Sequence, residues 1–202
     1  MLRHTRPAAI FAGLLAPLAL LAAPHVGSAA PDFTAKDVSG KTVKLADYKG
    51  KVVVLEWFNP NCPFVKKFYG SSKMQELQKD AASKGVVWLT VYSTAPKHAE
   101  DYYDDAALTK KVAELKALPS DVLADPSGAL VRLYDAKTTP QLFIIGVDGK
   151  LAYDGAIDSV RSPDAGDIAK AKPLFADALG AVLAGKPVAD AKNKSYGCGI
   201  KL

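Results

Sequence analysis

A run of large apolar and β-branched residues, Val52 to Phe58, is followed at once by the breaking segment Asn59 to Asn61. This junction constrains the fold more than any other stretch, because apolar runs with almost no polar interruption are typical of a central strand covered on both faces. Pro63 fits the first position of a helix, since it has no backbone N–H to leave unpaired. The sequence therefore predicts a buried strand, a sharp break, and a helix whose N-cap residue is Cys62.

The position of Cys62 favours a reactive sulfur. The first turn of a helix has unpaired N–H groups and a partial positive charge, and both favour thiolate over thiol. Lys66 and Lys67 add positive charge nearby, and such settings lower the pKa of cysteines in general. We therefore interpret Cys62 as a nucleophile whose thiolate is stabilised by the helix start at Pro63 and by the two lysines. The alternative is that Cys62 is a small buried hydrophobic residue beside the strand.

Helical spacing continues beyond the cysteine. The apolar residues with this spacing are Val65, Phe68, Met74, Leu77 and Ala81. Gly85 follows them as a stop signal, so the pattern predicts one amphipathic helix from Pro63 to Lys84. Val86 to Ser93 is a second β-rich run, and a strand, helix, strand unit of this kind should have parallel strands and a right-handed crossover.

Further elements flank this unit. Turn residues at Ser39 and Gly40 indicate a hairpin or an edge piece at Thr42 to Leu45. The other predicted strands are 121–124, 141–145 and 151–153, and the other predicted helices are 106–118, 129–134 and 172–184. Asp148 and Gly149 separate the last two strands and are typical of a tight hairpin.

The first thirty residues have the organisation of an export signal. Arg3 and Arg6 form a basic region, Ala8 to Ala23 form an apolar region, and small residues offer a cut somewhere in 22–30. The apolar stretch is short for a membrane span, so we expect no stable span after cleavage; an uncleaved anchor is the alternative. The sequence therefore predicts a protein of the periplasm, or one exported otherwise, with one domain at 31–190 and a mobile tail at 191–202.

Charge and composition exclude several classes of function. The formal net charge is +5 and falls by two charges when Arg3 and Arg6 leave with the signal, which is too mild to indicate a nucleic-acid partner. Two of the three histidines also leave, and the remaining one, His98, lies in a polar loop and is predicted to be a solvated surface residue. A multi-histidine metal site is thereby excluded. No phosphate loop or nucleotide fingerprint is visible either, so we predict neither a metal nor a cofactor.

Cys198 is the second of two cysteines in the chain and stands between Gly197 and Gly199. The flanking glycines indicate a mobile segment that exposes the sulfur, and an even cysteine count in an exported protein favours pairing. Three interpretations stay open: a resolving cysteine for Cys62, a permanent structural disulfide, or an independent thiol. A permanent disulfide would also occupy the predicted nucleophile.

Five short motifs occur in order along the chain. They are Ala30-Pro31-Asp32-Phe33-Thr34, the stretch from Gly40-Lys41 through Asp47 to Lys51, WFNPNCPFVKK, Thr139-Pro140, and VDGK at Val147 to Lys150. In this order and at these intervals they resemble the thioredoxin superfamily, and specifically the peroxiredoxin-like redoxin branch that includes alkyl hydroperoxide reductase and thiol-specific antioxidant proteins. The resemblance implies an α/β, thioredoxin-like fold, with a central mixed β-sheet flanked by helices.

The resemblance also implies a substrate-binding edge. In thioredoxin-like proteins the proline that matches Pro140 is cis and its loop faces the active-site sulfur, which would leave the backbone of Thr139 free to pair with an extended substrate. The alternative is that Pro140 simply starts an edge strand. Trp57 and Phe58 would shape the apolar floor of this site, although at least one of them is expected in the core, since neighbours on a strand face opposite sides. Glu56 is expected to be exposed at an edge or strand end, a proton relay being the alternative.

Two departures from the related families bear on the chemistry. Thioredoxin-type reductases have a second cysteine where this chain has Val65, so no local disulfide can form, and peroxiredoxins place their peroxidatic cysteine at that same position. The leading hypothesis is an exported thiol–disulfide oxidoreductase in which Cys62 attacks and Cys198 resolves. Its partners would be protein or small-molecule disulfides and an envelope thiol that donates electrons. The alternatives are a thiol peroxidase with antioxidant activity, which would act on peroxides, and a non-catalytic envelope module with a structural Cys62–Cys198 disulfide.

Overall fold

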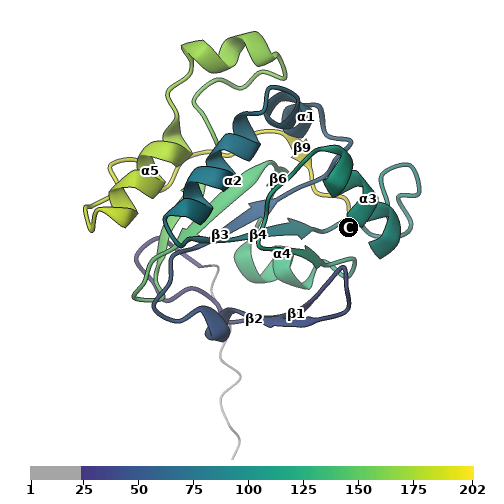
Figure 1. Cartoon of the computed structure of the whole chain (residues 1–202), viewed down its shortest axis with the longest axis horizontal. Helices are drawn as coiled ribbons and strands as arrows, with labels where there is room; N and C mark the ends of the chain where they lie inside the picture. Colours follow the sequence, from purple (N-terminus) through teal and green to yellow (C-terminus); the bar gives the residue numbers. More distant parts are fainter. Residues whose placement is uncertain (1–23) are drawn as a thin grey trace, which may run out of the picture.

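A seven-stranded mixed sheet forms the centre of the computed structural model, which describes residues 24–202 (Figure 1). The strand order is β2-β1-β5-β4-β3-β7-β8. The strands are β1 (Thr34–Asp37), β2 (Thr42–Lys44), β3 (Val53–Trp57), β4 (Val87–Tyr92), β5 (Asp121–Ala124), β7 (Gln141–Ile145) and β8 (Leu151–Gly155). The predicted thioredoxin-like α/β class is therefore confirmed. Most of the predicted export signal, residues 1–23, lies outside the described range.

β3 is central because its residues suit burial on both faces. All five of its residues are buried, and it pairs in parallel with β4 and antiparallel with β7. Side chains that alternate along β3 enter two separate cores: Val54 lies in the core on one face, and Val53 and Leu55 lie in the core on the other. The predicted strand, helix, strand unit is confirmed, since β3 and β4 are parallel and are joined through two helices.

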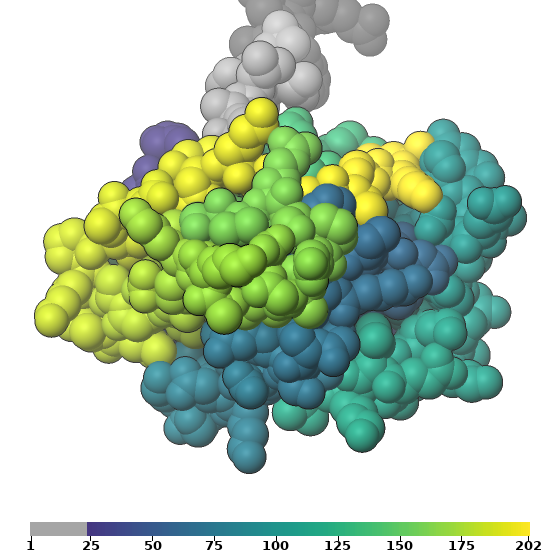
Figure 2. All heavy atoms as spheres, turned by 90° about the horizontal axis from the view of Figure 1, so that it is seen from above, coloured from purple at the N-terminus to yellow at the C-terminus, as the bar shows by residue number. Residues whose placement is uncertain are grey.

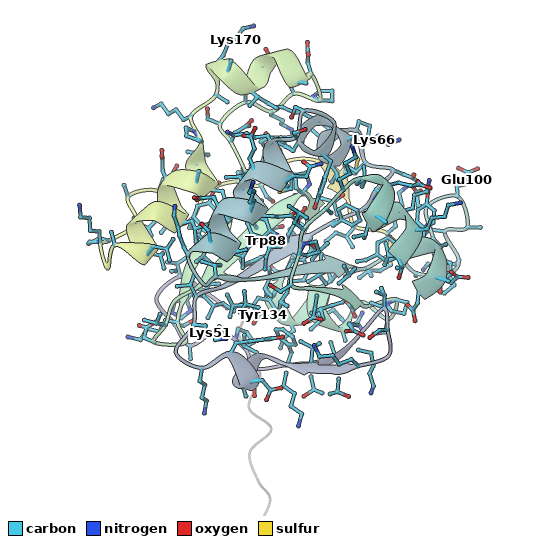
Figure 3. The ribbon with its side chains drawn as sticks, in the orientation of Figure 1. Lys51, Lys66, Trp88, Glu100, Tyr134 and Lys170 are labelled. Carbon is cyan, nitrogen blue, oxygen red and sulfur yellow. The ribbon has the colours of Figure 1, made fainter. Side chains whose placement is uncertain are left out.

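The helices cover the sheet unequally. The helical segments are η1 (Leu45–Tyr48), α1 (Pro63–Gly70), α2 (Lys73–Ser83), α3 (Asp105–Glu114), α4 (Ala129–Tyr134), η2 (Ala165–Lys170) and α5 (Leu174–Leu183). Helices α1, α2, α3 and α5 bury side chains in the core that contains Trp88, whereas α4 buries its side chains in the opposite core with Tyr134. Figure 3 labels Trp88 in the first of these cores and Tyr134 in the second. The sheet is therefore covered on both faces, as the apolar strands require.

The prediction of one helix from Pro63 to Lys84 is wrong. The chain forms two helices, α1 and α2, which are separated by a turn at Ser71 and Ser72. Ser72 has a left-handed backbone with φ of 63°, and it is the N-cap residue of α2. Glycine and serine are poor residues for a helix interior, so the sequence Gly70 to Ser72 ends one helix and starts the next. The apolar periodicity continues across the break because both helices bury residues in the same core.

Most of the other elements agree with the prediction. β5, α4 and β7 have the predicted bounds, α5 lies within its predicted range, and β2 forms the expected hairpin with β1. β8 continues two residues further than predicted, to Gly155. α3 ends earlier than predicted, at Glu114, and Lys116 beyond it takes a left-handed backbone with φ of 51°.

The segment that precedes the predicted domain is held on the hairpin of β7 and β8. The backbone N–H of Gly27 donates to Leu151 O at 2.8 Å, and that of Ala30 donates to Gly149 O at 2.9 Å. Leu151 N in turn donates to Ser28 O at 2.9 Å. Residues 27–30 are thus part of the folded body. No helix within residues 24–202 has the length and apolar character needed to cross a bilayer.

The tail that the sequence predicts to be mobile is packed against the body. β9 (Cys198–Gly199) pairs antiparallel with β6 (Thr138–Thr139), a two-residue strand just before β7. Figure 1 shows this segment in yellow behind α1, and Figure 2 shows it on the surface between blue and teal neighbours. His98, predicted to be a solvated surface residue, is instead partly buried against the chain end, with its ring Nε2 3.3 Å from Leu202 O.

Candidate active site

Cys62 is the N-cap residue of α1, as predicted, with an extended backbone (φ −64°, ψ 123°) and Pro63 in the first turn. Its carbonyl oxygen accepts from the amides of Val65 and Lys66 at 3.0 and 2.9 Å. The sulfur does not hydrogen-bond to the helix amides. It donates instead to the backbone oxygen of Thr139 at 3.0 Å, and the residue is only 3% exposed. The helix start therefore fixes where the sulfur lies, and a second loop determines what it faces.

That second loop contains a cis peptide bond between Thr139 and Pro140, as the family resemblance implies. The loop faces the Cys62 sulfur, as expected, and both residues are buried. The expectation that the Thr139 backbone is free does not hold in this structure, because Thr139 pairs in register with Cys198 of the tail. The hydroxyl of Thr139 is buried without a hydrogen-bond partner among the described residues.

The two cysteines meet at this loop as free thiols, although 135 residues separate them in the chain (positions 62 and 198). Burial, a hydrogen bond with Cys62 and the charge of Cys62 together raise the pKa of Cys198 to about 12, against the opposing influence of Lys201. Cys198 is therefore a protonated thiol at neutral pH. A protonated thiol in this position can donate a hydrogen bond to the Cys62 sulfur.

The predicted stabilising lysines occupy different environments. Lys66 is exposed and extends from α1 into solvent (Figure 3). The side chain of Lys67 is fully buried, and its ammonium group donates to Asp158 Oδ2 at 3.2 Å and lies 4.8 Å from the centre of the Phe68 ring. Its charge is therefore balanced by Asp158. The lysine that lines the cavity beside the sulfurs is Lys201, a residue of the tail that was not among the predicted site residues.

Glu56 is completely buried, so the expectation that it is exposed is wrong. Four side chains donate to its carboxylate: Trp88 Nε1 at 2.8 Å, Tyr69 Oη at 2.9 Å, Thr90 Oγ1 at 3.1 Å and Gln78 Nε2 at 3.3 Å. Desolvation raises the pKa of Glu56 to about 6, and these hydrogen bonds oppose the rise. The donors come from α1, α2 and β4, which explains how a central strand can hold a carboxylate.

Trp57 and Phe58 lie on opposite faces of the sheet. Trp57 packs in the core with Tyr134 and Phe143, with ring centres 5.8 and 5.1 Å away, so it follows the core interpretation and not the substrate floor. Phe58 is in the same core as Cys62 and lines the cavity beside it. Of the two predicted floor residues, only Phe58 is at the site.

A cavity of about 120 Å³ opens beside Cys62 and Cys198. This space is large enough for several water molecules and too small for a folded peptide. Its lining is mixed, and the polar members besides Thr139 are Asn59, Asn61, Ser93, Thr94, Asp101 and Lys201. Most of these come from the loop after β4 and from the tail, which sequence spacing could not relate to Cys62.

The two asparagines that end the predicted strand are fixed by this loop. Asn59 donates to Thr94 Oγ1 at 3.1 Å, and its own side-chain oxygen accepts from the amide of Asn61 at 2.8 Å. Tyr103 Oη donates to Asn61 Oδ1 at 2.9 Å. The segment that leads to Cys62 is therefore rigidly positioned against residues 94–103, and a site with fixed polar groups results.

Comparison with known proteins agrees with this architecture. Residues 26–154 match the AhpC/TSA family. Thiol-disulfide oxidoreductase ResA of Bacillus thuringiensis subsp. konkukian is 28% identical over 130 residues, which cover 64% of this chain and 69% of that protein. The crystal structure of an uncharacterised conserved protein from Geobacillus kaustophilus has a TM-score of 0.74 and 30% identity, and the match covers 88% of this chain and 92% of that one.

A candidate thiol:disulfide interchange protein DsbE from Chlorobium tepidum is also similar, with a TM-score of 0.54, 28% identity and coverage of 65% of this chain and 85% of that one. The family match covers β1 through most of β8, and so includes Cys62 and the loop at Pro140 that faces it. The chain belongs to the AhpC/TSA family.

Proposed function

We propose that this protein is a thiol–disulfide oxidoreductase in which Cys62 is the nucleophile and Cys198 the resolving cysteine. The observation that carries the proposal is the meeting of the two sulfurs at a helix start and a cis-proline loop. The names of the similar proteins ResA and DsbE support the same class of reaction. Pro63 starts the helix under Cys62, and Phe58, Thr139 and Pro140 surround the sulfur.

The reaction begins with the reduced pair. The Cys62 thiolate attacks one sulfur of a substrate disulfide; a Cys62–substrate bond forms, the substrate S–S bond breaks, and the departing thiolate takes up a proton. Cys198 then loses its proton and attacks the Cys62 sulfur, which releases the second substrate sulfur. The substrate gains two electrons and two protons, and the chain is left with a Cys62–Cys198 disulfide. An external thiol donor of the cell envelope reduces that disulfide again.

The two sulfurs have different surroundings. Cys62 lies at the start of α1, where the helix carries a partial positive charge, and its sulfur faces the backbone oxygen of Thr139. Lys66 and Lys67 contribute only to the wider positive field, since one is exposed and the other is paired with Asp158. The raised pKa of Cys198 keeps this thiol protonated until the mixed disulfide has formed.

We also propose that the protein works outside the cytoplasm, in the periplasm or an equivalent exported location. The basic and apolar regions of residues 1–23 support this. The hydrogen bonds of Gly27, Ser28 and Ala30 to the hairpin favour a cut just after Ala22 or Ala23, because a later cut would remove these contacts. Substrates would be protein or small-molecule disulfides.

The test is trapping with a Cys198→Ser variant. This variant should accumulate mixed disulfides with its substrates on Cys62, because the resolving step is blocked, and a Cys62→Ser variant should trap nothing. Non-reducing gels followed by mass spectrometry of the trapped species measure the outcome. Absence of mixed disulfides on Cys198→Ser, with Cys62 still open to alkylation, would contradict the exchange mechanism. A Cys62–Cys198 disulfide that resists reduction by glutathione would point to the structural role.

The size of the cavity supports a second candidate function, a thiol peroxidase. A space for several water molecules beside Cys62 admits hydrogen peroxide. Oxidation of Cys62 to sulfenic acid and resolution by Cys198 would release water and give the same disulfide. Consumption of peroxide by the reduced protein, without reduction of model disulfides, would favour this candidate over the first.

A further inference from the structure

The C-terminal segment 195–202, here called the strap, is seated on the same backbone edge that an extended substrate would use. Cys198 and Gly199 of the strap pair antiparallel with Thr139 and Thr138. The oxygen of Thr139 also accepts from the Cys62 sulfur. The strap therefore presents a cysteine to Cys62 in the manner of a bound peptide, although it belongs to the same chain.

The strap approaches this edge more closely than a residue with a side chain could. Gly197 has φ of 141°, and a Cβ placed on it would lie 2.0 Å from Thr139 O and 2.7 Å from Thr139 C. Both contacts are with backbone atoms, which cannot rotate away. At Gly199, two residues further on, a Cβ would meet nothing within 4 Å. Of the two glycines in the strap, only Gly197 therefore lies where a side chain would collide with the edge.

Contacts on both sides of the cysteine hold the strap down. On the N-terminal side, Tyr196 is 4% exposed; its hydroxyl donates to Asp158, and its ring packs edge-on against Phe64 at 5.7 Å. This joins the strap to the same carboxylate that balances Lys67.

On the C-terminal side, Lys201 forms an ion pair with Asp101, and its backbone oxygen accepts from Ala95 N at 2.8 Å. Ile200 and Leu202 pack against the core on the opposite face of the sheet from Cys62. The strap thus has a polar and an apolar contact on each side, which is the arrangement of a bound peptide ligand with side-chain subsites.

The seated strap closes the site to large molecules. Cys62 is 3% exposed, and the cavity that remains beside it is about 120 Å³. A thiolate must reach the substrate sulfur directly to displace the other one, so a peptide or protein disulfide cannot react with Cys62 while the strap is in place.

We propose that residues 195–202 are a tethered pseudosubstrate: an intramolecular peptide ligand of the Thr138–Thr139 edge that a cysteine-containing extended peptide must displace. This proposal deepens the proposed function. It rests on that function in one respect only, since disulfide exchange is the reason to expect a cysteine in the displacing peptide. The strap has a second effect after the mixed disulfide has formed. When it returns to the edge it competes with the bound substrate for the same backbone groups, and it brings Cys198 to the Cys62 sulfur at the same moment.

The site would prefer a substrate that resembles the strap. A peptide that takes its place needs an extended segment with a cysteine opposite Thr139 and no Cβ at the preceding position, because of the contact with Thr139 O. An aromatic residue before that glycine would reach the position of Tyr196 against Phe64. The predicted partner class is therefore an unfolded or flexible segment with the pattern aromatic-Gly-Cys.

The two glycines provide a matched test. In a Cys198→Ser background Cys62 is the only thiol of the chain, so alkylation reports its accessibility alone. Adding Gly197→Ala should unseat the strap and raise the rate of Cys62 alkylation by about tenfold or more, with a larger increase for a maleimide joined to a polyethylene glycol chain than for iodoacetamide. Adding Gly199→Ala should leave both rates within about twofold of the background. Equal rates in all three proteins would overturn the proposal.

A second pair of variants guards against misfolding of Gly197→Ala. Lys201→Ala removes the ion pair with Asp101, and Lys194→Ala removes an exposed lysine that precedes the strap. In the same background Lys201→Ala should raise the alkylation rate by about twofold to fivefold, the range expected for a partly exposed ion pair, and Lys194→Ala should not change it. An unchanged rate in Lys201→Ala, with native circular dichroism in both proteins, would also contradict the proposal.

A peptide supplied in trans tests the binding site itself. A synthetic peptide of residues 195–202 carrying Cys198→Ser should slow the alkylation of Cys62 in the Cys198→Ser, Gly197→Ala protein, and the same peptide with Gly197→Ala should not. No protection by either peptide would show that the edge does not bind the strap as a ligand. None of these measurements depends on turnover, so the strap can fail while disulfide exchange holds, and exchange can fail while the strap holds.

Discussion

Replacing Glu56 by glutamine should change how stability depends on pH. Glu56 has no exposed surface, and its pKa is raised from 4.5 to about 6 in the folded state, first by desolvation. Because the folded protein binds the proton more tightly than the unfolded chain, the contribution of this group to stability is largest below about pH 4.5. It decreases as pH rises through the interval between the two pKa values, and it is constant above about pH 6.

The expected magnitude follows from the shift. One pKa unit corresponds to about 1.4 kcal/mol, so a rise from 4.5 to about 6 removes about 2 kcal/mol from the free energy of unfolding between acid and neutral pH. Glu56→Gln has no proton to exchange in this range and should lose this dependence. The amide also presents an N–H to groups that donate to the carboxylate, of which Tyr69 and Thr90 can rotate their hydroxyls but Trp88 cannot. That mismatch should lower the free energy of unfolding of the variant by an amount that does not vary with pH.

Urea unfolding of the reduced proteins, followed by circular dichroism at about pH 4 and about pH 7, measures the difference. The difference in the free energy of unfolding, Glu56→Gln minus wild type, should be about 2 kcal/mol more positive at neutral pH than at acid pH. Glu76→Gln is the matched control, since Glu76 is an exposed glutamate of α2 that pairs with Lys73. A difference between wild type and Glu56→Gln that stays constant with pH would refute the assignment of a raised pKa.

Three further predictions concern the core and the site. Asp158→Ala should lower the free energy of unfolding by about 3 to 5 kcal/mol, because it leaves the buried ammonium group of Lys67 without its partner; urea unfolding measures this, and a loss below about 1 kcal/mol would contradict it. Phe175→Ala should cost about 3 to 5 kcal/mol by opening a cavity beneath Trp88 and Tyr153 in the helix-covered core. Cys62→Ser should abolish disulfide exchange with little change in the unfolding midpoint; residual exchange through Cys198 alone would contradict the assigned nucleophile.

The elements that could be predicted are those with a local cause. The apolar run from Val53 to Trp57 requires cover on both faces of the strand. Pro63 favours a helix start at its own position, whatever the path of the chain beyond α1. The break at Ser72 was missed because the apolar spacing on both sides of it is helical. Periodicity reports which face is buried and says little about whether one helix or two supply that face.

The environment of Glu56 could not be predicted for a different reason. A carboxylate in an apolar strand is costly to bury without hydrogen bonds, and the expectation of exposure rested on that cost. The donors that offset it stand 13 to 34 residues later, at Tyr69, Gln78, Trp88 and Thr90. None of them is unusual in its own segment. Only the packing of α1, α2 and β4 around β3 brings them to one point.

Gly197 is the clearest case of a residue whose role cannot be predicted from its local sequence. Read locally, a glycine beside a cysteine near the chain end indicates freedom of motion, because glycine restricts the unfolded backbone least. In the folded protein the absent side chain has the opposite consequence, since it lets the strap approach within a distance of Thr139 that a methyl group would prevent. Both meanings follow from one missing Cβ, and the choice between them depends on whether a partner surface exists elsewhere in the fold. Here that surface is the loop that also faces Cys62, so the residue that suggests a loose tail is the one that permits the strap to close the site.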